Sequence, residues 1–182
     1  DSSTGKSTLV RVLAGLATRA RGDLKMPEPH QVMIAPQKSY LPLGSLRGAL
    51  LYPETAPGIE DARLLAALER VGLGALTSRL DEVGRWDQML SNGERQRLAI
   101  ARLLVHRPAV AILDDSLSAL EEPAQASLLQ RLRSDLPRTT IISLGQRPAA
   151  DEMHDRQLTL ERTPDGARLV PIGSRRVLAD AK

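Results

Sequence analysis

The first residues of the chain have the types and the spacing of a phosphate-binding loop. The run D-S-S-T-G-K-S-T matches G-x-x-x-x-G-K-[ST] from its second position onward and adds one further hydroxyl. Gly5 lets the backbone curl so that successive N–H groups point at phosphate oxygens, and Lys6 carries a cation toward the β- and γ-phosphates. The Ser7 hydroxyl can ligate Mg²⁺. Taken alone, the same letters also fit a chance Gly-Lys-Ser segment on a capped helix.

Two further groups of polar residues lie downstream. Residues 109–113 are continuously apolar and lead directly into Asp114 and Asp115. A strand that ends in acid is how a nucleotide site places an aspartate for Mg²⁺ at the carboxyl edge of a sheet. Ser91 and Glu94 have the spacing of a capping box, which by itself indicates only the start of a helix.

The sequence predicts alternating helices and strands, and these elements must position the polar residues. Apolar periodicity predicts helices from residue 6 to about 20, across 45–79, at 93–106 and at 123–136. Short apolar or β-branched runs predict strands at 31–35, 109–113 and 139–144, and residues 157–161 and 167–172 flank a T-P-D-G turn that predicts a hairpin. The alternation predicts an α/β fold with a parallel sheet and a helical insertion.

Composition limits the other classes of protein. The 182 residues suffice for one α/β domain, and no apolar run exceeds five residues, so no transmembrane helix is predicted within them. No cysteine is present, which excludes a disulfide framework and thiol catalysis. The net charge is only +3, with 25 basic and 22 acidic residues interleaved, so no nucleic-acid surface is predicted.

The order of these motifs resembles that of the ATP-binding cassette (ABC) ATPases, from Asp1 to about Pro148. Residues 35–53, A-P-Q-K-S-Y-L-P-L-G-S-L-R-G-A-L-L-Y-P, resemble the Q-loop region of half-transporters such as peroxisomal fatty-acyl transporters and bacterial cobalamin or antimicrobial-peptide importers. The run W-D-Q-M-L-S at 86–91 resembles the lead into their signature, where Asn92 replaces the usual glycine and Gly93 is retained. The resemblance implies a P-loop NTPase fold with an ABC-type core. Residues 1–182 would form an ATP-binding domain with a helical signature subdomain at about 43–104 and a C-terminal hairpin and tail at about 154–182.

The resemblance also implies cofactors, ATP and Mg²⁺, and a role for each motif. The residues implied to bind the nucleotide are Ser3, Thr4, Gly5, Lys6, Ser7 and Thr8, with Ser91 and Gly93 meeting the ATP of a partner subunit. Those implied to hold Mg²⁺ are Ser7, Gln37 and Asp114. Those implied to act in catalysis are Asp115, Gln146 and Gln37.

Two departures from the family pattern bear on hydrolysis. Asp115 stands where the family usually has a glutamate as general base, and Gln146 stands where it usually has a histidine. Aspartate is one methylene shorter, roughly 1.5 Å of reach, and a misplacement of about 1 Å can cost on the order of 10²-fold in rate. Glutamine can donate a hydrogen bond but cannot ionise. We expect a slow ATPase, and the alternative is a regulatory half that binds ATP without hydrolysing it.

The resemblance implies partners as well. They are a transmembrane permease domain, fused upstream in the same polypeptide, and a second nucleotide-binding domain that closes an ATP-sandwich dimer. We expect a strand and the first loop glycine to precede Asp1, and we expect the domain to lie at the cytoplasmic face of a membrane, the inner membrane in a bacterium. A soluble ABC ATPase of DNA repair or translation is the rival interpretation, which a zinc-hook, coiled-coil or linker insertion would favour.

Overall fold

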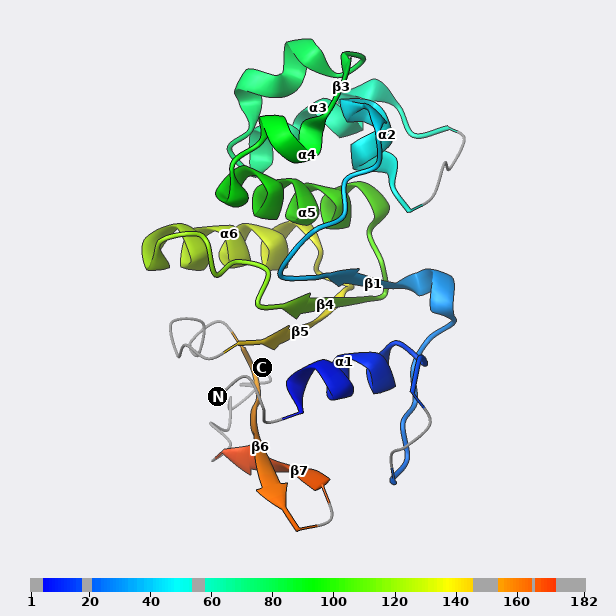
Figure 1. The fold of residues 1–182 in the computed structure, drawn as a ribbon, viewed down its shortest axis with the longest axis vertical. Coiled ribbons are helices and arrows are strands. Elements are labelled where there is room, and N and C mark those ends of the chain that lie inside the picture. The colour runs from blue at the N-terminus through cyan, green and yellow to red at the C-terminus, as the bar shows by residue number, and fades with distance from the viewer. Residues whose placement is uncertain (1–4, 18–20, 54–57, 146–153, 165, 173–182) are drawn as a thin grey trace, which may run out of the picture.

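The core of the molecule is a three-stranded parallel sheet. The computed structural model describes residues 5–17, 21–53, 58–145, 154–164 and 166–172. Strands β1 (Val32–Ala35), β4 (Val110–Asp114) and β5 (Thr140–Leu144) lie in the order β1-β4-β5 (Figure 1). Ala35 is paired with Leu113, and Asp114 with Leu144. All three strands therefore end at one edge of the sheet, and the predicted parallel sheet is confirmed.

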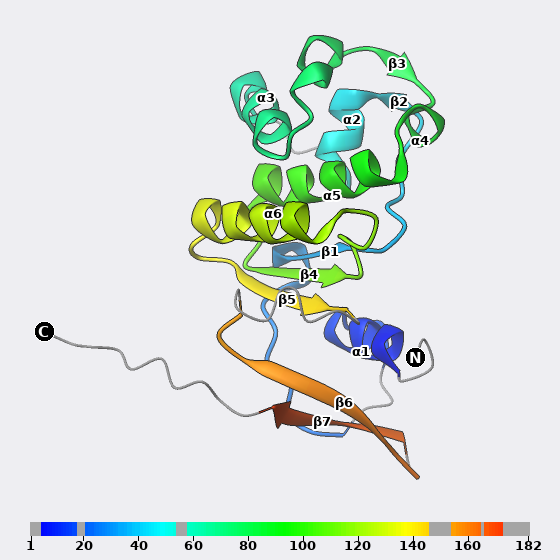
Figure 2. The ribbon, with the colours of Figure 1, turned by 90° about the vertical axis from the view of Figure 1, so that its left-hand side faces the viewer.

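Helices cover both faces of this sheet. Helix α1 (Lys6–Leu13) lies on one face, where Val10 packs with Val110 and Ile112. Helices α5 (Asn92–His106) and α6 (Glu122–Asp135) lie on the other face (Figures 1 and 2). The central strand β4 is buried from its first residue through Leu113, as the continuously apolar sequence of a strand covered on both faces requires.

Helix α1 is shorter than its sequence pattern predicts. It ends at Leu13, and Gly15 follows with a φ of 71°. The Gly15 N–H donates to the Val12 carbonyl at 3.0 Å. A glycine in this left-handed conformation closes a helix, although the apolar residues continue beyond it. The predicted helix to about residue 20 is thus wrong at its end, and residues 18–20 lie outside the described part.

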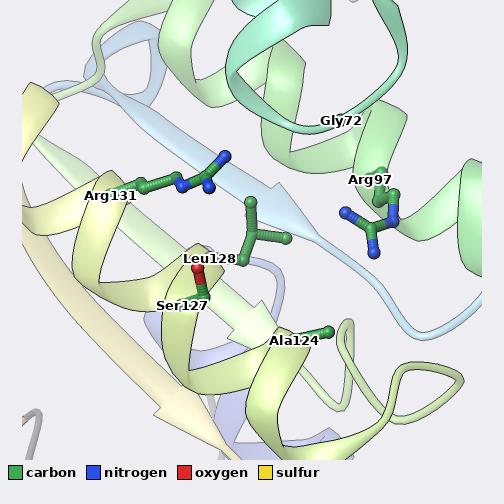
Figure 3. Close-up of a pocket in the computed structure, with 6 residues that line it drawn as sticks. All are labelled: Gly72, Arg97, Ala124, Ser127, Leu128 and Arg131. Atoms are coloured by element: carbon green, nitrogen blue, oxygen red, sulfur yellow. The ribbon is translucent and has the colours of Figure 1, made fainter.

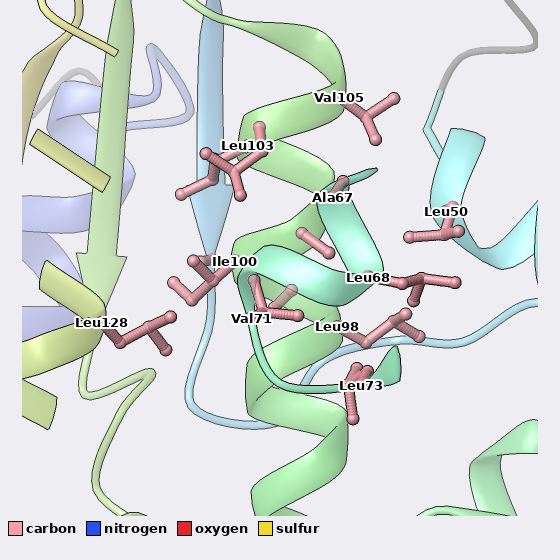
Figure 4. Packing of buried hydrophobic residues seen from close by; sticks show 14 of the residues in the cluster. Leu50, Ala67, Leu68, Val71, Leu73, Leu98, Ile100, Leu103, Val105 and Leu128 are labelled. Carbon is pink, nitrogen blue, oxygen red and sulfur yellow. The ribbon is translucent and has the colours of Figure 1, made fainter. Parts of the chain in front are cut away.

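A group of helices packs on the outer side of α5. It consists of α2 (Leu46–Leu51), α3 (Asp61–Arg70), the 3₁₀ helix η2 (Gly74–Arg79) and the short α4 (Trp86–Met89), with a two-residue pairing of β2 (Gly44–Ser45) and β3 (Val83–Gly84). Leu50, Leu68 and Leu98 meet in its interior and are fully buried (Figure 4). This interior is continuous with the core around α5 and α6, so the helical insertion is anchored on the same hydrophobic cluster as the sheet.

Two arginines join the end of α3 to α5 and to α6. Arg97 on α5 donates to the Val71 carbonyl at 2.8 Å, and Arg131 on α6 donates to the Arg70 carbonyl at 3.0 Å. They lie on opposite sides of a cavity of about 270 Å³ (Figure 3). Both cations thus meet carbonyls at the C-terminal end of α3, where the helix leaves carbonyls unpaired. Gly72 ends α3 there with a φ of 77°.

A hairpin lies near the start of α1. Strands β6 (Gln157–Thr163) and β7 (Gly166–Ile172) pair antiparallel, which confirms the predicted hairpin (Figure 1). A Cβ built on Gly5 would lie 3.7 Å from Leu160 Cδ2 and 3.8 Å from the Ala167 Cβ. The other short element is the 3₁₀ helix η1 (Pro29–Gln31) before β1. Within the described ranges, no helix has the length and hydropathy needed to cross a membrane.

Candidate functional site

The start of α1 has the backbone geometry expected of a phosphate loop. Gly5 is the residue before the helix and has a φ of 92° and a ψ of 10°, a left-handed conformation that favours glycine. Its carbonyl accepts from the Leu9 N–H at 2.9 Å. Lys6 begins the helix, and Ser7 and Thr8 are exposed on its first turn. The free N–H groups and the dipole of this helix end favour an anion.

Two adjacent carboxylates follow the apolar part of β4, at the end of the strand. Asp114 is the last residue of β4 and is half-buried. Burial raises its pKa, the neighbouring charge of Asp115 raises it further, and Lys6 acts in the opposite direction. Lys6 is therefore close enough to influence the charge of Asp114. Two adjacent carboxylates with one nearby ammonium form a site that a divalent cation would complete.

The backbone holds Asp115 in an unusual conformation at the edge of the sheet. Its φ is 50°, which is uncommon for a residue with a side chain. Its N–H donates to the Leu144 carbonyl at 2.8 Å, so the residue is fixed to the end of β5. Its Oδ1 lies 3.5 Å from the position of a Cβ built on Gly145. The carboxylate thus lies against the segment that leads into Gln146.

Gln37 lies at the same edge of the sheet. It follows the end of β1 by two residues and is exposed. Since β1 and β4 are parallel and in register, Gln37 and Asp114 leave the sheet on the same side. The carboxyl edge of a parallel sheet is where ligands of such folds bind.

The signature segment is fixed by a capping box at the start of α5. The Ser91 hydroxyl accepts from the Glu94 N–H at 3.3 Å, and the Ser91 N–H donates to Glu94 Oε2 at 2.8 Å. The Ser91 hydroxyl also donates to Glu94 Oε2 at 2.7 Å. These bonds, the hydroxyl's first, hold the pKa of Glu94 below its ordinary value. The predicted capping box is confirmed, and α5 begins one residue earlier than expected.

The structure brings some of the predicted site residues together and keeps others apart. Gly5 and Lys6 begin α1 on the side of the sheet where β4 ends in Asp114, and Asp115 follows directly (Figure 1). Among the described residues, none of the hydrogen bonds or ion pairs links Ser91 with residues 5–8. Ser3, Thr4 and Gln146 lie outside the described residues.

Comparison with known proteins agrees with the resemblance to ABC ATPases. The family model described as "ABC transporter" matches residues 1–118, more than half of the chain. The chain belongs to the ABC transporter family. It is 42% identical over 160 residues to an ABC transporter ATP-binding protein of Haemophilus influenzae, a match that covers 88% of this chain and 27% of the relative. It is 38% identical over 173 residues to the human lysosomal cobalamin transporter ABCD4, with 88% and 28% covered.

A solved structure supports the family fold. A bacterial Atm1-family ABC exporter with ATP bound aligns with a TM-score of 0.75 and 26% identity, covering 87% of this chain and 30% of the exporter. The predicted ABC ATPase fold is confirmed, as is the resemblance to half-transporters that include cobalamin transporters. The chain spans less than a third of the length of the relatives named here.

The site of this ABC domain suits ATP with Mg²⁺. The candidate oxygen donors are the Ser7 hydroxyl on the first turn of α1, the Gln37 carboxamide after β1 and the Asp114 carboxylate at the end of β4. Oxygen ligands of this kind are those that Mg²⁺ prefers.

The sequence patterns missed one polar residue of the ABC domain. Gln96 on α5 is only 5% exposed, and its carboxamide bonds the segment after Asp115. It shares one helix face with the buried Ile100 and Leu103. A single polar side chain in an apolar stripe is a signal for a buried hydrogen-bonding residue.

Proposed function

We propose that this domain binds and hydrolyses ATP to power transport of a substrate across a membrane. The observation that carries the proposal is that α1 begins, at Gly5 and Lys6, on the side of the sheet where β4 ends in Asp114 (Figure 1). Phosphoryl transfer depends mostly on positioning and electrostatic stabilisation, which such an arrangement supplies. Family membership and the exporter fold support the transport role.

We assign the residues of the site as follows. The helix end at Gly5 and the Lys6 ammonium bind the β- and γ-phosphates. Ser7, Gln37 and Asp114 would hold Mg²⁺, which would supply positive charge to the phosphate oxygens. Asp115 orients the attacking water and accepts its proton, and Gln146 donates a hydrogen bond toward the γ-phosphate.

The proposed assembly has two further parts. A permease domain fused upstream would dock near the Q-loop, where Tyr40 is 62% exposed and Leu43 is 75% exposed. A second copy of the domain would place its Ser91 and Gly93 on the ATP bound here. We place the domain at the cytoplasmic face of a membrane, which in a bacterium is the inner membrane.

A second candidate function is a regulatory half that binds ATP but hydrolyses it poorly. The shorter carboxylate of Asp115 and the glutamine at position 146 favour it. A full ATPase and a regulatory half would share the same ATP-binding site. Steady-state phosphate release, measured after ATP binding has been established, distinguishes them.

The test of the proposal is ATP binding by Lys6→Ala in the full-length protein that contains this chain. Loss of the ammonium should abolish binding, because it removes the mobile cation directed at the phosphates. Lys25→Ala, in an exposed loop, is the matched control and should bind as the wild type does. An affinity for Lys6→Ala within about threefold of wild type, or about 0.65 kcal/mol, would refute the phosphate-loop assignment.

A further inference from the structure

Gln96 connects the signature helix to the segment that follows the proposed general base. Its Oε1 accepts from the Ala119 N–H at 2.9 Å, and its Nε2 donates to Ser118 Oγ at 3.3 Å. A backbone N–H can only donate, so the oxygen of the carboxamide must face Ala119. Both ends of the side chain are therefore used, at a position that is 5% exposed.

A second contact joins the same two segments. A Cβ built on Gly93 would lie 3.3 Å from Leu120 Cδ2 and 3.9 Å from the Ala119 carbonyl oxygen. The first distance is tighter than an ordinary contact, so the start of α5 lies directly on residues 119–120. Gly93 and Gln96, both on α5, thus contact the same loop, residues 118–120.

The loop leads back to Asp115. The Ser118 N–H donates to the Asp115 carbonyl at 3.2 Å, and the Asp115 N–H donates to the Leu144 carbonyl at 2.8 Å. A continuous set of hydrogen bonds therefore runs from α5 through Gln96 and Ser118 to the residue that holds the base carboxylate.

We propose that Gln96 is a positioning residue that couples the two ATP sites of the dimer. Through α5 it sets the position of Ser91 and Gly93 against the partner's ATP. Through Ser118 it sets the position of Asp115 against the ATP of its own subunit. This inference rests on the proposed ATP-sandwich dimer, in which one subunit contributes to both sites.

Glutamine suits this position because its flexible side chain carries both a hydrogen-bond donor and an acceptor. Methionine has a similar size, but it cannot accept the Ala119 N–H or donate to Ser118 Oγ as the carboxamide does, so it removes the two hydrogen bonds that join α5 to the loop. The loop has another support, since Gln125 on α6 donates to the Leu120 carbonyl at 2.7 Å. Gln96→Met should therefore release the coupling without unfolding the loop.

The test uses full-length dimers of two differently tagged subunits, in which Lys6→Ala silences one site. In the first arm, Gln96→Met is in the subunit with intact Lys6, so the working site has a variant loop and a wild-type signature. In the second arm, Gln96→Met is in the Lys6→Ala subunit, so the working site has a wild-type loop and a variant signature. The reference is the Lys6→Ala dimer without Gln96→Met.

Coupling predicts that kcat falls about tenfold in both arms, while KM for ATP stays within about twofold, because the phosphate loop is untouched. Gln130→Met, exposed on α6, should leave kcat unchanged in both arms. A fall in kcat in one arm alone would show that Gln96 acts on one ATP site only, and would overturn the coupling. An unchanged kcat in both arms would overturn the coupling as well.

A second measurement does not depend on turnover. In the wild-type homodimer, a non-hydrolysable ATP analogue should slow hydrogen–deuterium exchange in residues 116–120. Gln96→Met should still bind the analogue but lose this ATP-dependent slowing, and retained slowing would overturn the proposal. Wild-type subunits that fail to form an ATP-dependent cross-link between Thr4→Cys and Asn92→Cys would overturn the sandwich dimer and this inference together. Normal cross-linking with an intact response in Gln96→Met would overturn the inference alone.

Discussion

Asp115 shows how a single backbone conformation can limit a catalytic group. Its φ of 50° and its N–H bond to Leu144 fix the direction in which the carboxylate leaves the sheet. A side chain fixed in this way cannot recover the length of a missing methylene by a small shift of the loop. The proposed base therefore falls short of the position that a glutamate would reach.

This geometry predicts the effect of restoring the usual family residues. Asp115→Glu together with Gln146→His should raise ATP turnover in the full-length protein, because the base gains reach and the histidine can ionise. The two groups act on one γ-phosphate, so their effects should not add. Steady-state phosphate release measures this, with Asp23→Glu in an exposed loop as the control. A double variant no faster than wild type would show that neither residue limits the rate.

Motif spacing predicted some of the proposed site residues and missed others. Lys6 and Asp114 could be placed together because a phosphate loop and an acid-ended strand meet at the carboxyl edge of a parallel sheet. Gln96 could not be placed, because its partners Ser118 and Ala119 lie 22 and 23 residues away and are brought there by tertiary packing.

At the scale of single elements, the cap of α5 joins stability to the proposed function. Ser91 and Glu94 bond each other in both directions, so the N-terminal turn is fixed before any nucleotide arrives. A signature segment that is already ordered loses little conformational freedom on binding. The capping box therefore supports the proposed binding of the partner's ATP.

The depressed pKa of Glu94 gives a prediction for stability against pH. A carboxylate whose pKa is lowered by folding stabilises the folded state above its unfolded pKa, and this stabilisation is lost as pH falls through the folded pKa. Glu94→Gln keeps a bond but loses the charge, so it should lower the free energy of unfolding at pH 7 by up to about 1 kcal/mol. The difference from wild type should shrink toward zero below about pH 4.

Chemical denaturation of an ATP-binding domain extended upstream of Asp1 measures this difference. Glu122→Gln is the matched control, because Glu122 lies in the first turn of α6, where no side chain caps the helix. A difference between Glu94→Gln and wild type that is the same at pH 3 and pH 7 would show that the charge of Glu94 does not act through the cap.

The sequence predicted the bounds of the strands more accurately than those of the helices. Strands of the sheet were placed within one residue of their observed bounds, because an apolar run between polar or proline residues fits only a buried strand. The stretch predicted as helical over 45–79 is divided into α2, α3 and η2. Leucines recur at helical spacing on both sides of Pro53 and Gly58, so the periodicity alone did not show the breaks between these helices. The β2–β3 pairing has two residues per strand, too few to show any alternation.

At the scale of the whole molecule, the ATP site and the signature belong to separate parts. The proposed ATP site lies at the edge where the strands of the sheet end, whereas Ser91 is the N-cap of α5, the helix on which the helical group packs. Arg97 on α5 and Arg131 on α6 hold that group through the end of α3. The helix that carries the signature is therefore packed on both sides, which fits the proposed role of binding ATP held by another copy.

Cross-linking between copies tests this central claim most directly. These 182 residues contain no cysteine, so within them Thr4→Cys in the phosphate loop and Asn92→Cys in the signature supply the thiols, and the wild-type full-length protein is the control for any cysteine elsewhere. In the full-length protein, a disulfide between subunits should form with ATP and Mg²⁺ under non-hydrolysing conditions, and should be lost when Lys6→Ala is added. Cross-linking to the same extent without nucleotide, or none with it, would contradict the shared ATP site.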